Sequence, residues 1–129
     1  MVDISKPFIK ETLNFLLDLL PQAGQILRRY FHAEDLPSKK KGTHDFVTAA
    51  DLAVDSFLKK ELSKKYPEIA ILSEETARND LDSYKDKSPL WIIDPLDGTA
   101  NFARGDVNFS ISIALVEKGK PLLGVIFAP

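Results

Sequence analysis

The sequence predicts an α/β protein in which two N-terminal helices pack on a sheet, arranged as a layered α+β sandwich. Apolar residues recur at helical spacing over residues 4–31, and a second helical pattern begins near Thr48. Strand-like segments follow, and in Phe109–Leu115 apolar residues alternate with serine and alanine. Because the helical patterns come first and the strands follow, each helix has a sheet on which to bury its apolar face.

The composition fits one soluble domain and excludes several classes of protein. The chain has 129 residues, of which 44% are hydrophobic and 28% charged, with a formal net charge of −2. This balance gives no basic surface for nucleic acid. Cysteine is absent, which excludes disulfides, a thiolate nucleophile and cysteine-bound zinc. With no signal peptide and no apolar run long enough for a membrane span, we expect a cytoplasmic protein that does not bind membranes.

Two features divide the helical part of the chain. Pro21 lies inside the first helical pattern, so we expect a kink or a break there. A polar connection is expected over residues 33–44. Thr48 can then cap the second helix, with Asp51 as the acidic member of a capping box. Lysines crowd the last turns of this helix, and Pro67 ends it.

The strands are expected at Ile69–Leu72, Leu90–Ile93, Phe109–Leu115 and Leu122–Phe127, with a hairpin turn at Glu117–Lys120. The last of them is apolar on both faces apart from one glycine, and such a strand needs cover on both sides. We therefore expect either a second copy of the chain or further chain in the natural protein, and we favour the second.

The stretch WIIDPLDGTANF, from Trp91 to Phe102, carries the candidate chemistry. Asp94 and Asp97 would repel each other unless a cation lies between them, and Mg²⁺ prefers such oxygen ligands. Gly98 permits a tight turn, and Thr99 can begin a short helix whose backbone N–H groups would bind phosphate. The same pattern can also be a plain loop, with aspartate and glycine present for turn chemistry alone.

A second acidic strand end favours the metal site. Glu74 and Glu75 follow one strand in the way that Asp94 follows the next. If these strands are neighbours, several carboxylates gather at one edge of the sheet, which is costly without a metal.

The D-x-D-G-T motif of aspartyl-phosphate phosphatases is a rival interpretation. This chain has one more residue between its acids, Asp94 and Asp97. In an extended segment that residue would turn one side chain to the opposite face, which argues against an aspartyl nucleophile.

The sequence resembles the inositol monophosphatase family of magnesium-dependent, lithium-sensitive phosphatases. The motifs that carry the resemblance follow the family's order and spacing over nearly the whole chain: DFVT at Asp45–Thr48 with Asp51 after it, ILSEE at Ile71–Glu75, Trp91–Phe102, and the strand pair in Phe109–Pro129. The resemblance implies the N-terminal half of that family's fold. Residues 1–129 would be a metal-binding α/β domain, part of a longer phosphatase that forms a homodimer.

The resemblance also implies metal ligands. Glu74 would bind the first Mg²⁺ and orient the attacking water, and Asp94 would be shared between two metals. Leu96 would contribute its backbone carbonyl, and Asp97 would bind the second metal.

The catalytic and substrate-binding residues follow from the same resemblance. Thr99, paired with Asp51, would help Glu74 to activate the water, although capping alone also explains Asp51. The implied substrate-binding residues are Glu74, Leu96, Asp97, Gly98 and Thr99.

The expected function is hydrolysis of a phosphate monoester by a metal-activated water, with no phosphoenzyme. Inositol phosphates and phosphoadenosine phosphate are the expected substrates. The alternative is a noncatalytic module that binds metal or phosphate, because the C-terminal half that recognises substrate and a further aspartate ligand are absent from this sequence.

Overall fold

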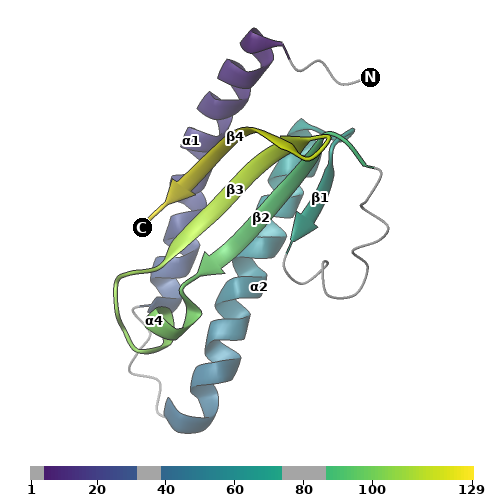
Figure 1. The fold of residues 1–129 in the computed structure, drawn as a ribbon. Coiled ribbons are helices and arrows are strands. Elements are labelled where there is room, and N and C mark those ends of the chain that lie inside the picture. Colours follow the sequence, from purple (N-terminus) through teal and green to yellow (C-terminus); the bar gives the residue numbers. More distant parts are fainter. Residues whose placement is uncertain (1–4, 32–38, 74–86) are drawn as a thin grey trace.

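The computed structural model describes residues 5–31, 39–73 and 87–129, with side chains in the second range from residue 49 onward. The elements are α1 (Lys6–Phe31), α2 (Lys39–Lys65), β1 (Ala70–Ser73), β2 (Leu90–Asp97), α4 (Thr99–Ala103), β3 (Ser110–Glu117) and β4 (Lys120–Phe127). Helices α1 and α2 lie side by side behind the sheet in Figure 1. The predicted layered α+β arrangement is confirmed.

The sheet is mixed and has the strand order β1-β2-β3-β4 among the described residues. Strands β1 and β2 are parallel, whereas β2, β3 and β4 form an antiparallel meander. The β3–β4 connection is the predicted hairpin turn, with Lys118 and Gly119 at φ 49° and 79°. Two successive positive φ values are typical of the tight turns that match the twist of paired strands.

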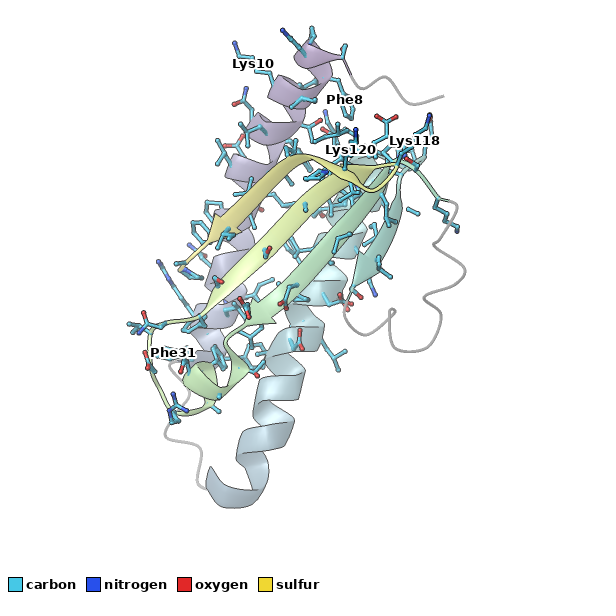
Figure 2. The ribbon with its side chains drawn as sticks, viewed as in Figure 1. Phe8, Lys10, Phe31, Lys118 and Lys120 are labelled. Carbon is cyan, nitrogen blue, oxygen red and sulfur yellow. The ribbon has the colours of Figure 1, made fainter. Side chains whose placement is uncertain are left out.

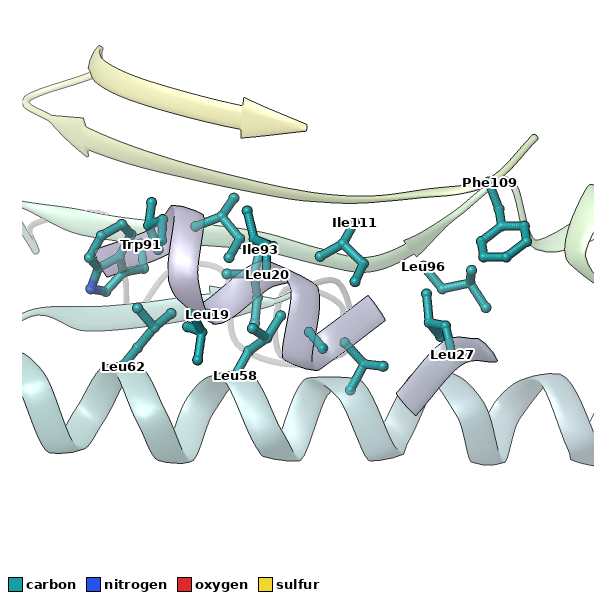
Figure 3. Close-up of a cluster of buried hydrophobic side chains, with 14 of the residues drawn as sticks. Leu19, Leu20, Leu27, Leu58, Leu62, Trp91, Ile93, Leu96, Phe109 and Ile111 are labelled. Atoms are coloured by element: carbon teal, nitrogen blue, oxygen red, sulfur yellow. The ribbon is translucent and has the colours of Figure 1, made fainter. Parts of the chain in front are cut away.

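The hydrophobic core lies between the sheet and the two long helices (Figure 3). In β3, Ile111, Ile113 and Leu115 are fully buried, while Ser112 and Ala114 between them are only half-buried. This alternation confirms the predicted two-faced strand. On the helices the core consists of Leu16, Leu19, Leu20, Ala23 and Leu27 from α1 and Ala50, Val54, Leu58 and Leu62 from α2.

The face of the sheet opposite α1 and α2, which we call the open face, is covered by no described helix. Ile92 of β2 and Ile126 of β4 are 40% and 75% exposed. No helix among the described residues is long and apolar enough to cross a membrane.

Of the kink or break expected at Pro21, the break is wrong, because α1 continues through this residue, and the kink stays a prediction. Pro21 is exposed, and its missing N–H deprives only the carbonyl of Leu17, which lies on an exposed turn. Water can satisfy that carbonyl, while the buried leucines on either side keep the helix packed on the sheet.

The expected start of the second helix is also wrong. Helix α2 begins at Lys39, so Thr48 lies inside the helix and Asp51 is not part of a capping box. The predicted connection over residues 33–44 is therefore partly helical. Lysine has a high helix propensity and no proline interrupts residues 39–65, which allows the helix to extend despite the cost of Gly42.

Candidate active site

The two predicted acidic strand ends point to the same edge of the sheet. Strand β1 is parallel to β2, and Ser73, the last residue of β1, pairs with Ile93, the residue before Asp94. Ser73 is itself buried, so the end of β1 is held firmly against β2. Glu74 and Glu75 lie outside the described residues.

A β-bulge brings Asp94 and Asp97 to the same face of the sheet. Asp94 pairs with Ser112 and Asp97 with Ser110, so three steps along β2 match two steps along β3. Strand β2 therefore contains one extra residue between the two acids, which is the definition of a bulge. Because Ser110 and Ser112 are two apart on a regular strand, they share one face, and so do their partners.

This register corrects the expectation that the additional residue would turn one acid to the opposite face. The bulge absorbs that residue, and both carboxylates belong to the open face, since Ile111 between the two serines faces the core. Asp94 is half-buried, and its Oδ1 accepts a hydrogen bond from the backbone N–H of Leu96 at 3.4 Å. The Leu96 side chain is buried and anchors the bulge in the core.

Gly98 forms the predicted sharp turn directly after Asp97. Its φ of 87° and ψ of 42° are left-handed, and it stands at the N-terminus of α4. The Phe102 N–H donates to the Gly98 carbonyl at 2.9 Å and closes the first turn of that helix. The short helix expected to begin at Thr99 is therefore confirmed, and the Thr99 side chain is exposed.

Helix α4 is held in place by an aromatic cluster at one end of α1. Phe102 and Phe109 stack edge to face, with their ring centroids 4.9 Å apart. Phe31, which lies beside α4 in Figure 2, contacts both rings, with centroids 5.6 Å and 5.2 Å away. These rings fix the segments on both sides of the loop that follows α4.

Asp51 lies on α2, which packs against both β2 and α4. The carboxylate is half-buried, and the helix that carries it contacts the helix that begins at Thr99. The expected hydrogen bond between Asp51 and the Thr99 hydroxyl remains a prediction.

Asn101 is a residue that the sequence pattern did not single out. Its side-chain N–H group donates to the carbonyl oxygen of Asn108 at 2.8 Å, and its Oδ1 accepts from the Arg104 guanidinium. The only signal in the sequence is its place in the short helix α4, directly after the acidic turn.

The oxygen ligands at this turn fit part of a divalent cation site. The Asp97 carboxylate is exposed and has no ion pair or hydrogen bond among the described residues. Two carboxylates and the Leu96 carbonyl supply the ligands that Mg²⁺ prefers. Within the described part of the chain, however, no three histidine or acidic side chains converge. Further ligands would come from water or from residues outside the described ranges, such as Glu74 directly after β1.

The fold and these residues define a class: a layered α/β domain in which two acids of one parallel strand share a face, with a glycine turn directly after them. Residues 9–129 match the inositol monophosphatase family. The chain belongs to that family.

Known proteins agree with this assignment. The chain is 39% identical over 119 residues to a fructose-1,6-bisphosphatase/inositol-1-monophosphatase of Thermotoga maritima, covering 92% of this chain and 44% of the relative. It is 38% identical over 117 residues to the 3'(2'),5'-bisphosphate nucleotidase CysQ of Haemophilus influenzae, covering 91% and 43%. The crystal structure of inositol monophosphatase II from Staphylococcus aureus superposes with a TM-score of 0.74 at 31% identity, over 92% of this chain and 41% of that one. The chain thus spans less than half the length of these relatives.

Proposed function

We propose that the chain is the N-terminal, metal-binding domain of a magnesium-dependent phosphomonoesterase. The observation that carries this proposal is the bulge in β2, which sets Asp94 and Asp97 on one face beside the end of β1. A structural loop would need turn residues but no such alignment of acids. The phosphatase names of the Thermotoga and Haemophilus relatives support the same reaction class.

In this proposal Glu74, Asp94 and the Leu96 carbonyl would hold one cation, and Asp94 and Asp97 would hold a second. When bound, Mg²⁺ supplies Lewis acidity, which makes a nearby water more nucleophilic and offsets charge on the leaving oxygen. Gly98 makes the left-handed turn that leads into α4, and the backbone N–H groups of Gly98 and Thr99 would bind the phosphate.

Asp51 and Thr99 would orient the attacking water together with Glu74. A hydroxyl that donates to a carboxylate presents its oxygen lone pairs to a neighbouring water, which fixes the direction of attack. Asp51 and Thr99 belong to helices that pack against each other, which supports this pairing.

The test is release of inorganic phosphate from inositol phosphate and from phosphoadenosine phosphate. It should depend on Mg²⁺ and fall when Li⁺ is added. We expect it in a full-length protein that contains these residues, and the 129-residue chain is assayed beside it. If neither releases phosphate from either substrate at any Mg²⁺ concentration, the proposed function is wrong.

A noncatalytic module that binds metal or phosphate is the second candidate. It applies to the 129-residue chain taken by itself, which matches 44% of the Thermotoga protein. Binding of Mg²⁺ without turnover in either protein would support it.

We further propose that the parent protein is a cytoplasmic homodimer whose substrates are small phosphorylated molecules. The names of the Thermotoga phosphatase and the Haemophilus nucleotidase support small phosphorylated molecules as substrates. The exposed isoleucines of the open face support association.

A further inference from the structure

The loop between α4 and β3 starts and ends at the candidate site. It leaves α4 at Ala103 and returns to Ser110, which pairs with Asp97 in the sheet. The position of Asp97 therefore depends on where this loop delivers the chain.

The side chain of Asn101 ties this loop to the acidic turn. Its Nδ2 donates to the Asn108 carbonyl at 2.8 Å. That same carbonyl oxygen lies only 2.9 Å from the position that a β carbon on Gly98 would take, and the Phe109 Cα lies 3.3 Å from it. The Asn101 amide thus holds the returning chain directly against the turn that follows Asp97.

Other contacts determine the shape of the loop without the Asn101 side chain. The Asp106 N–H donates to the Asn101 backbone carbonyl at 2.8 Å, and Asp106 Oδ1 accepts from the backbone and side-chain N–H groups of Asn108 at 3.0 and 2.9 Å. A substitution at Asn101 leaves these contacts in place, since none involves its side chain. The substitution therefore weakens only the contact between the loop and the Gly98 turn.

We propose that Asn101 is a positioning residue, which holds Asp97 in the orientation that binds the divalent cation by fixing the Asn108 carbonyl against Gly98. This inference rests on the proposed function, because it requires Asp97 to be a ligand. Residues that orient metal ligands typically change metal affinity by about 10–100-fold when they are replaced.

The test uses Mg²⁺ as the only probe and the 129-residue chain. The Asp97 amide signal is followed in two-dimensional ¹H–¹⁵N spectra during a MgCl₂ titration, and thermal unfolding is recorded without metal. Asn101→Ala removes the amide donor and is compatible with a helix. We expect its Mg²⁺ affinity to fall about tenfold.

Arg104→Ala is the matched control. It removes the Arg104 contact with Asn101 Oδ1 and leaves the Nδ2 hydrogen bond to Asn108. We expect wild-type Mg²⁺ affinity for this variant. Asn101→Asp is the second variant, used if the alanine variant does not fold, since it keeps the acceptor for Arg104 and loses the donor. It too should bind Mg²⁺ more weakly, even though it adds a negative charge.

The outcomes separate the two proposals. If the wild-type chain binds Mg²⁺ and both Asn101 variants bind it with the wild-type affinity, the positioning role is wrong and the proposed function stands. If Arg104→Ala weakens binding as much as Asn101→Ala, the amide donor is not the cause and the inference is overturned. If the wild-type chain shows no Mg²⁺-dependent shift at Asp97 while a full-length protein is active, the inference is overturned. The proposed reaction then stands, but without Asp97 as a ligand. If neither the wild-type 129-residue chain nor the full-length protein binds Mg²⁺, the proposed function is wrong as well.

Discussion

The carbonyl oxygen of Asn108 occupies the space beside Gly98 into which a β carbon would project, 2.9 Å from that position. Gly98 is also left-handed, with φ 87°. Two independent constraints therefore require glycine at the residue after Asp97: the backbone conformation and the close approach of the returning loop.

Gly98→Ala should destabilise the chain by about 1–3 kcal/mol, because alanine is strained at this φ and its methyl group meets backbone rather than a flexible side chain. Urea unfolding measures the change. Gly105→Ala is the control, since Gly105 has a φ of 80° and no atom within 4 Å of the position that its β carbon would take. It should cost about 1 kcal/mol. Equal losses for the two variants would show that the contact with Asn108 has no energetic consequence.

Asp94→Asn should reduce phosphate release by about 100-fold or more in any chain of this protein that is active, because an amide cannot replace the charge that balances a divalent cation. Initial rates at saturating Mg²⁺ measure the loss. Asp18→Asn, on the exposed side of α1, provides a control with the same chemical change and should leave the rate unaltered. Turnover near the wild-type level in Asp94→Asn would rule out its role as a ligand.

Substitutions at Thr99 and Asp51 should reduce enzyme activity through one shared interaction rather than independently. If the hydroxyl donates to the carboxylate, Thr99→Ala and Asp51→Asn each remove the same interaction. The double variant should then be little worse than the more damaged single variant. Values of kcat for the four proteins give the coupling energy, expected at about 1–2 kcal/mol. Additive effects would mean that the two residues act separately.

The sequence predicted the parts of this fold that depend on local pattern. The alternation in β3, the hairpin at Lys118 and Gly119, and the turn at Gly98 each follow from residue type and spacing alone. The start of α2 could not be predicted in this way. Thr48 has the chemistry of a helix cap, and nothing nearby in the sequence shows that the helix continues before it.

The bulge in β2 illustrates a second limit. Whether the residue between Asp94 and Asp97 turns a side chain over depends on the register with β3, which pairs residues far along the chain. Period-two reasoning on one strand therefore gave the wrong face. The role of Asn101 could not be predicted from the sequence for the same reason. Its acceptor is the backbone carbonyl of Asn108, and any residue could supply that atom.

Trp91 offers a test of core packing behind the site. Its side chain is fully buried next to Tyr66, with ring centroids 5.8 Å apart, yet its indole N–H has no hydrogen-bond partner among the described residues. Trp91→Phe loses apolar contacts but also removes a buried donor that costs about 1–3 kcal/mol when unsatisfied.

The two effects oppose each other, so Trp91→Phe should destabilise the chain by only about 1 kcal/mol, against about 3–5 kcal/mol for Trp91→Ala. Chemical unfolding of both variants measures the difference. A phenylalanine variant as unstable as the alanine variant would indicate that the indole N–H is satisfied in solution.

Association through the open face can be tested at Ile126. This residue is 75% exposed and lies in the same row across the sheet as Ser112 and Asp94. Burying isolated apolar side chains of this size is worth about 1.5–3 kcal/mol each, so a second copy of the chain gains stability by covering them. We expect the 129-residue chain to dimerise as its concentration rises.

Ile126→Lys should shift that equilibrium towards monomer, because a charged side chain would be buried in the interface. Sedimentation velocity over a concentration series measures the dimer fraction. Val107→Lys is the control: Val107 is 72% exposed but lies in the loop before β3, so the variant should dimerise as the wild type does. A wild-type chain that sediments as a monomer at every concentration would contradict the prediction, and so would an Ile126→Lys variant with an unchanged dimer fraction.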